Sequence, residues 1–190
     1  MGEYHECRHI DANQTVYRRR SSHDAGRLSL RADARRIDRD DPFTGGEHGY
    51  TTISIGTRAQ VFVEDSGLGY CFAAETGFQI ATNPDVVLAP DFAFVAKDRL
   101  PDDVPKKHVP LAPDLVTETR SPSDTKREVA TKTLFWLQTG VKEVWILEPA
   151  AQTLTVHRTN EPLQVLGAND ILDGGTILPG FTFTLSRLFR

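Results

Sequence analysis

A strand, a helix and a second strand follow one another between residues 112 and 149, and this order constrains the fold more than any other feature. APDLVTET is rich in β-branched residues, and KEVWILEP is nearly continuous in apolar residues, as in a strand covered on both faces. Between them, SPSDTKREVATKTLFWLQTG has the pattern of a helix. Thr125 and Glu128 fit a capping box, and Gly140 stands where a C-terminal cap belongs. The sequence therefore predicts a crossover helix between two strands.

Other segments of the chain predict further helices and strands. HGYTTISIGTRAQVFVEDSG carries Ile55, Ala59 and Phe62 at helical spacing, so a helix is expected to begin near His48. The runs GYCFAA and GFQIAT favour a hairpin, and APDFAFVAKD favours a strand that opens at Asp91. TLTVHR and the late segment LPGFTFTLSRLF predict further strands. Together these elements predict an α/β domain of the α+β type, with a mixed central sheet flanked by helices.

Length and charge bound the organisation of the chain. A chain of 190 residues is long enough for one domain with its own core. Residues 1–45 have scattered apolar positions and are expected to form an arm of uncertain structure, whereas residues 46–190 are expected to form the folded domain. Residues 1–40 hold nine arginines and seven acids, but the whole chain has a net charge of -4. This balance excludes a globally basic nucleic-acid coat, although an acidic enzyme can still contact nucleic acid locally.

The composition also indicates a location. No apolar run approaches the roughly 20 residues needed to span a bilayer, which excludes a membrane protein. The first residues, MGEYHECRHIDANQ, lack the basic patch and apolar stretch of a secretory signal. Cys7 and Cys71 are the only cysteines. We therefore expect a cytoplasmic protein without a disulfide framework, in which Cys71 is a small core residue.

Three carboxylates are candidates for a metal site. Asp91 and Asp114 each follow Ala-Pro at the mouth of a predicted strand. Asp114 and Glu118 lie on one strand about 13 Å apart, which is too far to share an ion. Asp91 and Glu118 belong to different strands, so their carboxylates can converge if those strands pair. Oxygen ligands suit Mg²⁺ or Mn²⁺, ions that support phosphodiester hydrolysis.

Each member of this carboxylate pair also has a structural interpretation. An aspartate after proline is a common turn residue, which would account for Asp91 without catalysis. Glu118 is more informative, because an acid between threonines inside a strand is unfavourable unless it is exposed to solvent or has a functional role.

These residues carry a resemblance to a known family. APDFAFV, PDLVTETRSPSDT, the helix with Lys132, TGVKEVWILEP and LPGFTFTLSRLF resemble the Uma-two (Uma2) family of restriction-endonuclease-like proteins, over roughly three quarters of the chain. The resemblance implies a fold of the PD-(D/E)XK nuclease superfamily, in which an aspartate and a glutamate on adjacent strands bind a divalent metal. Asp91 and Glu118 match those two positions. The superfamily lysine usually stands two residues after the glutamate, where this chain has Arg120, and Lys132 matches the family's helical lysine.

A catalytic place for Lys132 agrees with the helix pattern. The residue shares a face with Val129, Phe135 and Trp136, so its ammonium could point at the carboxylates. There it would orient the attacking water and neutralise phosphate charge. The alternative is a surface pair with Glu128, worth a few tenths of a kcal/mol.

Three more residues have candidate roles. Arg120 has the strand parity of Glu118, about 7 Å along, and could bind the scissile phosphate or neutralise Glu118. Members of the family usually carry a further acid before the first long helix, and that acid can complete the metal site. The N-terminal part of this chain departs from that pattern, so Glu47 is the candidate replacement ligand. His48 is expected to be a capping or surface residue.

Two functions from different classes follow. The first is a metal-dependent DNA endonuclease in which Asp91 and Glu118 hold Mg²⁺ or Mn²⁺, Lys132 positions the water and Arg120 binds the phosphate. The second is a catalytically inactive nuclease-fold module that binds nucleic acid or a protein partner. DNA is the expected substrate, and a homodimer is expected because cutting both strands takes two sites.

Overall fold

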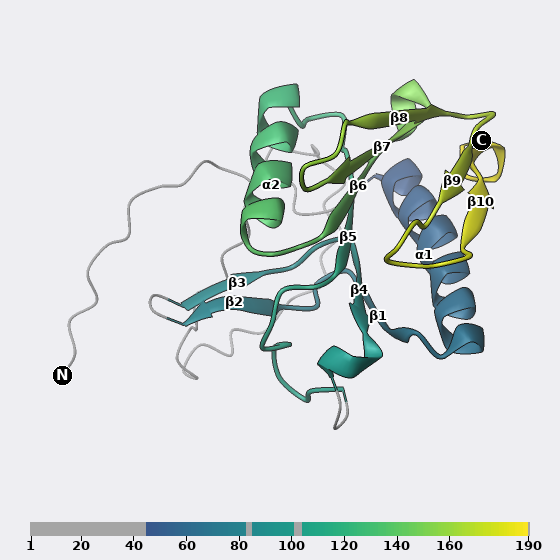
Figure 1. The fold of residues 1–190 in the computed structure, drawn as a ribbon. Helices are drawn as coiled ribbons and strands as arrows, with labels where there is room; N and C mark the ends of the chain where they lie inside the picture. Colours follow the sequence, from purple (N-terminus) through teal and green to yellow (C-terminus); the bar gives the residue numbers. More distant parts are fainter. Residues whose placement is uncertain (1–44, 83–84, 101–103, 190) are drawn as a thin grey trace, which may run out of the picture.

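The computed structural model describes residues 45–82, 85–100 and 104–189, so the predicted arm lies outside the described residues except for Gly45. Its centre is a six-stranded sheet in the order β1-β4-β5-β6-β7-β8 (Figure 1). Only the β5–β6 pair in this sheet is parallel, so the prediction of a mixed sheet is confirmed. The six strands are β1 (Gly69–Ala73), β4 (Phe92–Ala96), β5 (Leu115–Thr119), β6 (Glu143–Glu148), β7 (Thr153–Arg158) and β8 (Gln164–Gly167).

The predicted strand, helix and strand form the centre of this arrangement. Helix α2 (Lys126–Gln138) connects the parallel strands β5 and β6, and both strands are buried almost throughout. Its capping box is present, with the Glu128 N–H donating to the Thr125 hydroxyl and the Thr125 N–H donating to the Glu128 carboxylate. Gly140 follows the helix with φ of 96°, a left-handed conformation that glycine adopts without strain. All three sequence predictions for this unit are confirmed.

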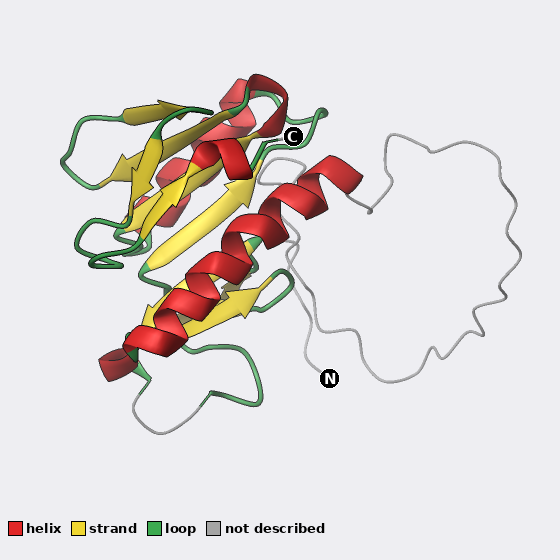
Figure 2. Ribbon diagram, turned by 90° about the vertical axis from the view of Figure 1, so that its right-hand side faces the viewer, coloured by secondary structure: helices red, strands yellow, loops and turns green. Residues whose placement is uncertain are grey.

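Different elements cover the two faces of the sheet (Figures 1 and 2). Helix α1 (Gly46–Ser66) runs obliquely across one face, where Ile55 and Ala59 join the main core as their spacing predicts. Strands β9 (Ile171–Asp173) and β10 (Thr182–Thr184) cover the same face beside it. Helix α2 covers the other face, where Trp136 packs against Val116, Val144 and Ile146. None of the described helices is both long and apolar enough to cross a membrane.

The predicted hairpin between GYCFAA and GFQIAT is wrong. Strand β1 pairs with β4, and β2 (Phe78–Thr82) pairs instead with β3 (Asp85–Leu88). Gly69 permits the first pairing, because a Cβ atom there would stand 2.1 Å from the Val95 carbonyl oxygen. Strand β2 turns out of the main sheet, and the Phe78 ring packs edge-on against Phe72 of β1, with centroids 5.4 Å apart.

Asp114 ties three strands together at the end of the sheet remote from Glu118. Its side chain is 1 % exposed and accepts a hydrogen bond from the Ala96 N–H at 2.9 Å. It also forms ion pairs with Arg99 at 3.0 Å and Lys142 at 2.7 Å. Burial raises the pKa of this carboxyl, but the Ala96 N–H and the two cations outweigh burial and hold the pKa below its ordinary value. Asp114 is therefore a structural residue, as its separation from Glu118 indicated.

The capping box gives a first prediction about stability. Thr125→Ala removes the side-chain acceptor of the Glu128 N–H and should lower the free energy of unfolding by about 1 kcal/mol. Urea denaturation followed by circular dichroism measures this change. Thr131→Ala is the matched control, since Thr131 lies exposed in the same helix and its hydroxyl bonds only the Arg127 carbonyl. An equal loss in both variants would contradict the assignment.

Asp114 gives a prediction about pH. Asp114→Asn weakens both ion pairs and should cost about 1.5–3 kcal/mol at neutral pH. Because the folded-state pKa is lowered, this stabilisation is present above the unfolded pKa of about 3.9 and is lost as pH falls through the folded value. The difference between wild type and variant, measured by urea denaturation, should be constant from pH 8 to 5 and shrink below about pH 4. A difference that grows on acidification would overturn this prediction.

Candidate active site

The pairing of β4 with β5 brings the two candidate metal ligands together. Phe92 is opposite Thr117, and the same register continued by one residue sets Asp91 opposite Glu118. Asp91 stands directly before β4, and its Oδ2 accepts a hydrogen bond from the Thr119 backbone N–H at 2.7 Å. The strand pairing on which the sequence argument depended is thus confirmed.

Glu118 is a buried carboxylate whose two oxygens each have a donor from α2. The residue is 6 % exposed, its Oε2 lies 2.7 Å from Lys132 Nζ, and its Oε1 accepts from Trp136 Nε1 at 2.8 Å. Burial raises the pKa of Glu118, and the nearby Asp91 charge adds to this, whereas Lys132 and the Trp136 hydrogen bond act in the opposite direction; the net shift is upward.

Lys132 takes the inward position that its helix face predicts. It contacts Glu118 and not Glu128, whose carboxylate is occupied by the Thr125 backbone and hydroxyl. Burial lowers the pKa of Lys132, but the Glu118 charge and hydrogen bond and the Asp91 charge together raise it. Lys132 is therefore a charged ammonium that bonds Glu118 and also feels the charge of Asp91.

His48 is a site residue that the sequence analysis missed. It was expected to be a capping or surface residue, but it is 8 % exposed and its Nε2 lies 3.2 Å from Asp91 Oδ2. Burial lowers the pKa of His48, yet the hydrogen bond and charge of Asp91 and the Thr119 backbone outweigh burial and raise it. In turn, the pKa of Asp91, which burial alone would raise, is held below its ordinary value by His48 and the Thr119 N–H.

The helix pattern contained a signal for His48. The residue precedes Ile55 by seven positions and Ala59 by eleven, so it lies on the inward stripe of α1. Thr52 follows on the same side, and its hydroxyl hydrogen-bonds the Thr119 hydroxyl at 2.6 Å. Two polar residues, His48 and Thr52, on the buried face of a helix indicate that polar groups of the sheet lie against that face.

Arg120 pairs with Glu148 and not with Glu118, whose neutralisation was one alternative expected of it. Its Nη1 lies 2.7 Å from Glu148 Oε2, and its Nε and Nη2 donate to the Asp124 carbonyl. The expectation that Arg120 neutralises Glu118 is therefore wrong, because α2 supplies Lys132 for that purpose. Its contact with a phosphate stays a prediction. Glu47 is exposed in the first turn of α1, and its role as a ligand also stays a prediction.

The donor set is compatible with a hard divalent cation. No group of three His, Cys, Asp or Glu side chains gathers around a common point in the described part of the chain. Mg²⁺ does not require such a group, because it keeps several waters and is usually bound through one or two carboxylates plus substrate phosphates. Asp91 and Glu118 supply two carboxylates, and the pKa of Glu118 is raised first by burial and then by the charge of Asp91. These two residues could hold the ion.

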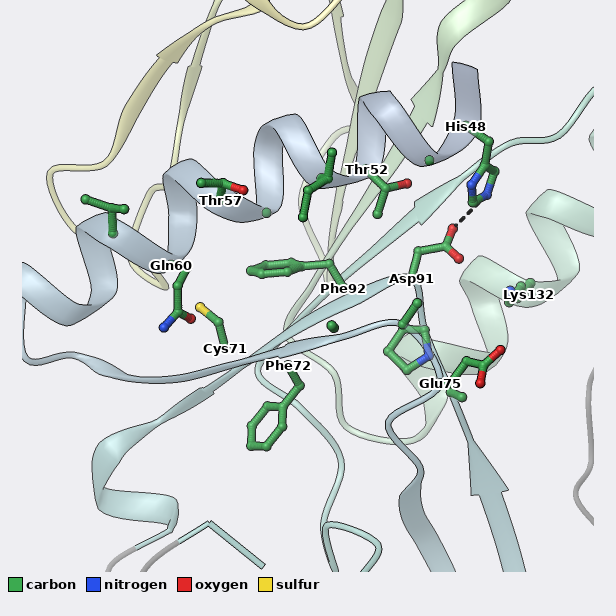
Figure 3. A pocket seen from close by; sticks show the side chains of 18 residues that line it. His48, Thr52, Thr57, Gln60, Cys71, Phe72, Glu75, Asp91, Phe92 and Lys132 are labelled. Atoms are coloured by element: carbon green, nitrogen blue, oxygen red, sulfur yellow. Dashed lines mark ion pairs between the residues drawn. The ribbon is translucent and has the colours of Figure 1, made fainter. Parts of the chain in front are cut away.

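A cavity of about 820 Å³ opens beside the carboxylates (Figure 3). His48, Asp91 and Lys132 line one end of it, and α1 and β1 form its walls. Cys71 packs against the main core as predicted and also lines this cavity. Burial and the charge of Glu64 raise the pKa of the Cys71 thiol to about 12. The cavity gives the site access to a molecule larger than water.

Comparison with known proteins agrees with this geometry. The chain is similar in fold to a solved structure described as a "putative nuclease belonging to DUF820 from Anabaena variabilis", with a TM-score of 0.67 and 20% sequence identity. The match covers 78% of this chain and 83% of that one. No curated protein matches the chain. The Uma2 family, described as "Putative restriction endonuclease", matches residues 40–186. The chain therefore belongs to the Uma2 family.

Proposed function

We propose that this protein is a metal-dependent DNA endonuclease that hydrolyses phosphodiester bonds, with Asp91 and Glu118 as the ligands of Mg²⁺ or Mn²⁺. The observation that carries the proposal is the placement of Glu118, a buried carboxylate opposite Asp91 with an ammonium 2.7 Å away. Metal-dependent phosphodiester hydrolysis uses carboxylates that hold the ion and a cation nearby; here Asp91 and Lys132 line a cavity, and Lys132 bonds the buried Glu118. Membership of a family described as restriction endonucleases supports the same reaction.

Lys132 and Trp136, the two α2 residues that bond Glu118, have separate parts in the proposed reaction. A bound divalent ion would stabilise charge on the phosphate and lower the pKa of a water. The Lys132 ammonium has three donors, so it can keep its bond to Glu118 while it orients a water or holds a phosphate oxygen. Trp136 fixes the Glu118 carboxylate from the other side.

Two neighbouring groups position Asp91. The Thr119 N–H and His48 Nε2 both lie on Asp91 Oδ2, so they fix the direction of the carboxylate. We assign His48 a positioning role for this reason. Arg120 uses three of its five N–H groups on Glu148 and Asp124, so it can bind a phosphate oxygen and keep both contacts.

A second candidate function is a nuclease-fold module that binds nucleic acid or a protein without cutting. The observation in its favour is that the described residues offer two carboxylates and no assembled third ligand. The catalytic proposal is favoured because a purely structural Glu118 would not need a second carboxylate opposite it, and that carboxylate, Asp91, lines a cavity.

Nicking of supercoiled plasmid tests the proposed function. Glu118→Gln removes the negative charge from the site and should reduce the nicking rate in Mg²⁺ or Mn²⁺ by about 100-fold or more, with wild type inactive in EDTA. Glu143→Gln is a matched control. Glu143 is also a buried strand glutamate that accepts hydrogen bonds from an indole, Trp145, and from a cation, Arg158. It stands at the start of β6, opposite Leu115, whereas Glu118 is opposite Ile146.

The Glu143→Gln protein should nick at the wild-type rate if circular dichroism shows it folded. Equal rates for wild type and Glu118→Gln, or equal losses in the two variants, would overturn the catalytic assignment and favour the binding module.

Substitutions at Lys132 test its proposed part in the reaction. Lys132→Ala should lower the single-turnover nicking rate by about 100-fold, because general acid–base or electrostatic help of this kind contributes roughly 10²–10⁴. Lys132→Arg keeps the charge and should recover only a small part, since the planar guanidinium cannot place its donors where the compact ammonium places them. Lys142→Ala is the control, because Lys142, like Lys132, pairs with a buried carboxylate, in this case that of Asp114. Full activity of Lys132→Ala would show that the ammonium only stabilises the fold.

A further inference from the structure

The cavity beside the carboxylates borders an open edge of the main sheet. Strand β1 is the last strand on its side, and within the described part of the chain it pairs only with β4. Phe94, which is opposite Cys71, directs its carbonyl to the Asp114 N–H on the other side of β4. Opposite residues of an antiparallel pair turn their backbone groups either toward each other or away from each other, so the N–H and C=O of Cys71 point out of the sheet. Because Cys71 also lines the cavity, a strand placed there can pair with β1.

Helix α1 borders the same space with exposed apolar side chains. Ile53 is 62% exposed and Val61 is 51% exposed, and both line the cavity. They flank the stripe of α1 that packs on the sheet, to which Ile55 and Ala59 belong. An occupant of the cavity would therefore contact the open edge of β1 and cover these side chains, and the removal of apolar surface from water favours binding.

The charges that line the cavity favour a basic occupant. Glu75 and Asp91 are the acids among the lining residues, and Lys132 is the one lysine or arginine. Lys132 already bonds the buried Glu118. Figure 3 shows Glu75, Asp91 and Lys132 toward the same end of the view. A segment that carries both arginines and apolar residues would complement this lining.

One short stretch of the N-terminal arm has this chemistry, although the arm lies outside the described residues. In GRLSLRA, residues 26–32, Leu28 and Leu30 alternate with Arg27, Ser29 and Arg31. In an extended chain, such alternation sets the leucines on one side and the arginines on the other. Residues 26–36 hold four arginines against one aspartate, so the stretch is basic as well as apolar.

The stretch is within reach of the cavity. The described chain begins at Gly45, and His48 in the first turn of α1 lines the cavity. From His48 to Val61 the helix advances about 20 Å, a length that about six residues of a strand cover. The residues between Arg31 and Gly45 span up to about 45 Å when extended. The chain therefore allows residues 26–32 to lie anywhere along the cavity.

We propose that residues 26–32 of this chain bind in the cavity as a strand added to the open edge of β1. Their leucines would contact the apolar side chains of α1, and their arginines would approach Glu75 and Asp91. The same chain is favoured over a separate peptide, because a tethered segment has an effective concentration of the order of mM. The inference does not depend on metal binding or on cleavage of DNA.

Photo-crosslinking in the full chain tests the inference. Thr57→Cys in a Cys7→Ser background places a thiol at an exposed position that lines the cavity, and a maleimide–diazirine reagent is attached to it. Burial and the charge of Glu64 raise the pKa of the Cys71 thiol to about 12, so that thiol reacts slowly with the maleimide. After irradiation, mass spectrometry of the digested chain should identify residues 26–32 as the main crosslinked segment.

Two comparisons make this result specific. Ser66→Cys, labelled in the same way, is the matched control, because Ser66 is exposed on α1 but does not line the cavity. It should not crosslink to residues 26–32. A mixture of unlabelled and isotope-labelled chains shows whether the bond forms within one chain. Crosslinks from Thr57 that reach only other segments or only a second copy, or equal yields from the two positions, would overturn the inference.

Charge reversal tests the proposed partners of the arginines. Arg27→Glu together with Arg31→Glu brings like charges to the carboxylates of the cavity and should lower the crosslink yield about tenfold. Arg18→Glu together with Arg19→Glu makes the same change in net charge outside the stretch and should leave the yield unchanged. Equal yields from the two double variants would show that this stretch has no special part in binding and would overturn the inference.

Discussion

The register between β4 and β5 is the constraint on which the rest of the site depends. With Phe92 opposite Thr117, β4 begins just where β5 reaches Glu118, so Asp91 and Glu118 face each other at the same end of these two strands. The ladder no longer provides a carbonyl for the Thr119 N–H at that point, and the Asp91 carboxylate accepts the bond instead. A slip by one residue would turn Glu118 to the opposite face and away from α2. The parallel neighbour β6 helps to prevent such a slip, because β5 is paired along its whole length on that side.

Two buried glutamates in this fold show how similar local contacts serve different purposes. Glu143 and Glu118 each accept a hydrogen bond from a tryptophan indole and one or more from a cation. The guanidinium of Arg158 donates to both oxygens of Glu143, and this two-point contact holds that carboxylate fixed. Glu118 has a single bond from a lysine and a second carboxylate beside it, which leaves its charge incompletely balanced. The first arrangement stabilises the fold, and the second is suited to accepting a cation.

Local signals in the sequence were sufficient for several elements and insufficient for others. The capping box and the left-handed Gly140 were readable because they depend on residues only a few positions apart. The hairpin prediction failed because strand propensity does not specify a partner, and β1 pairs with β4 through residues 19 to 27 positions apart in the sequence. The partner of Arg120 was not predicted for the same reason. It pairs with Glu148, which stands at the end of the neighbouring strand β6.

The sequence by itself determined which residues could do chemistry. It singled out Asp91 and Glu118 as acids of two predicted strands, and the resemblance to the family singled out Lys132. The inward face of α2 agreed with Lys132, because the order of polar and apolar residues along a helix fixes the direction of each side chain. Only the tertiary structure decided which of these groups meet, that His48 holds Asp91, and that a groove extends from them along α1. Those contacts join elements that are distant along the chain, and their distances follow from how helices pack on a sheet, which no local pattern specifies.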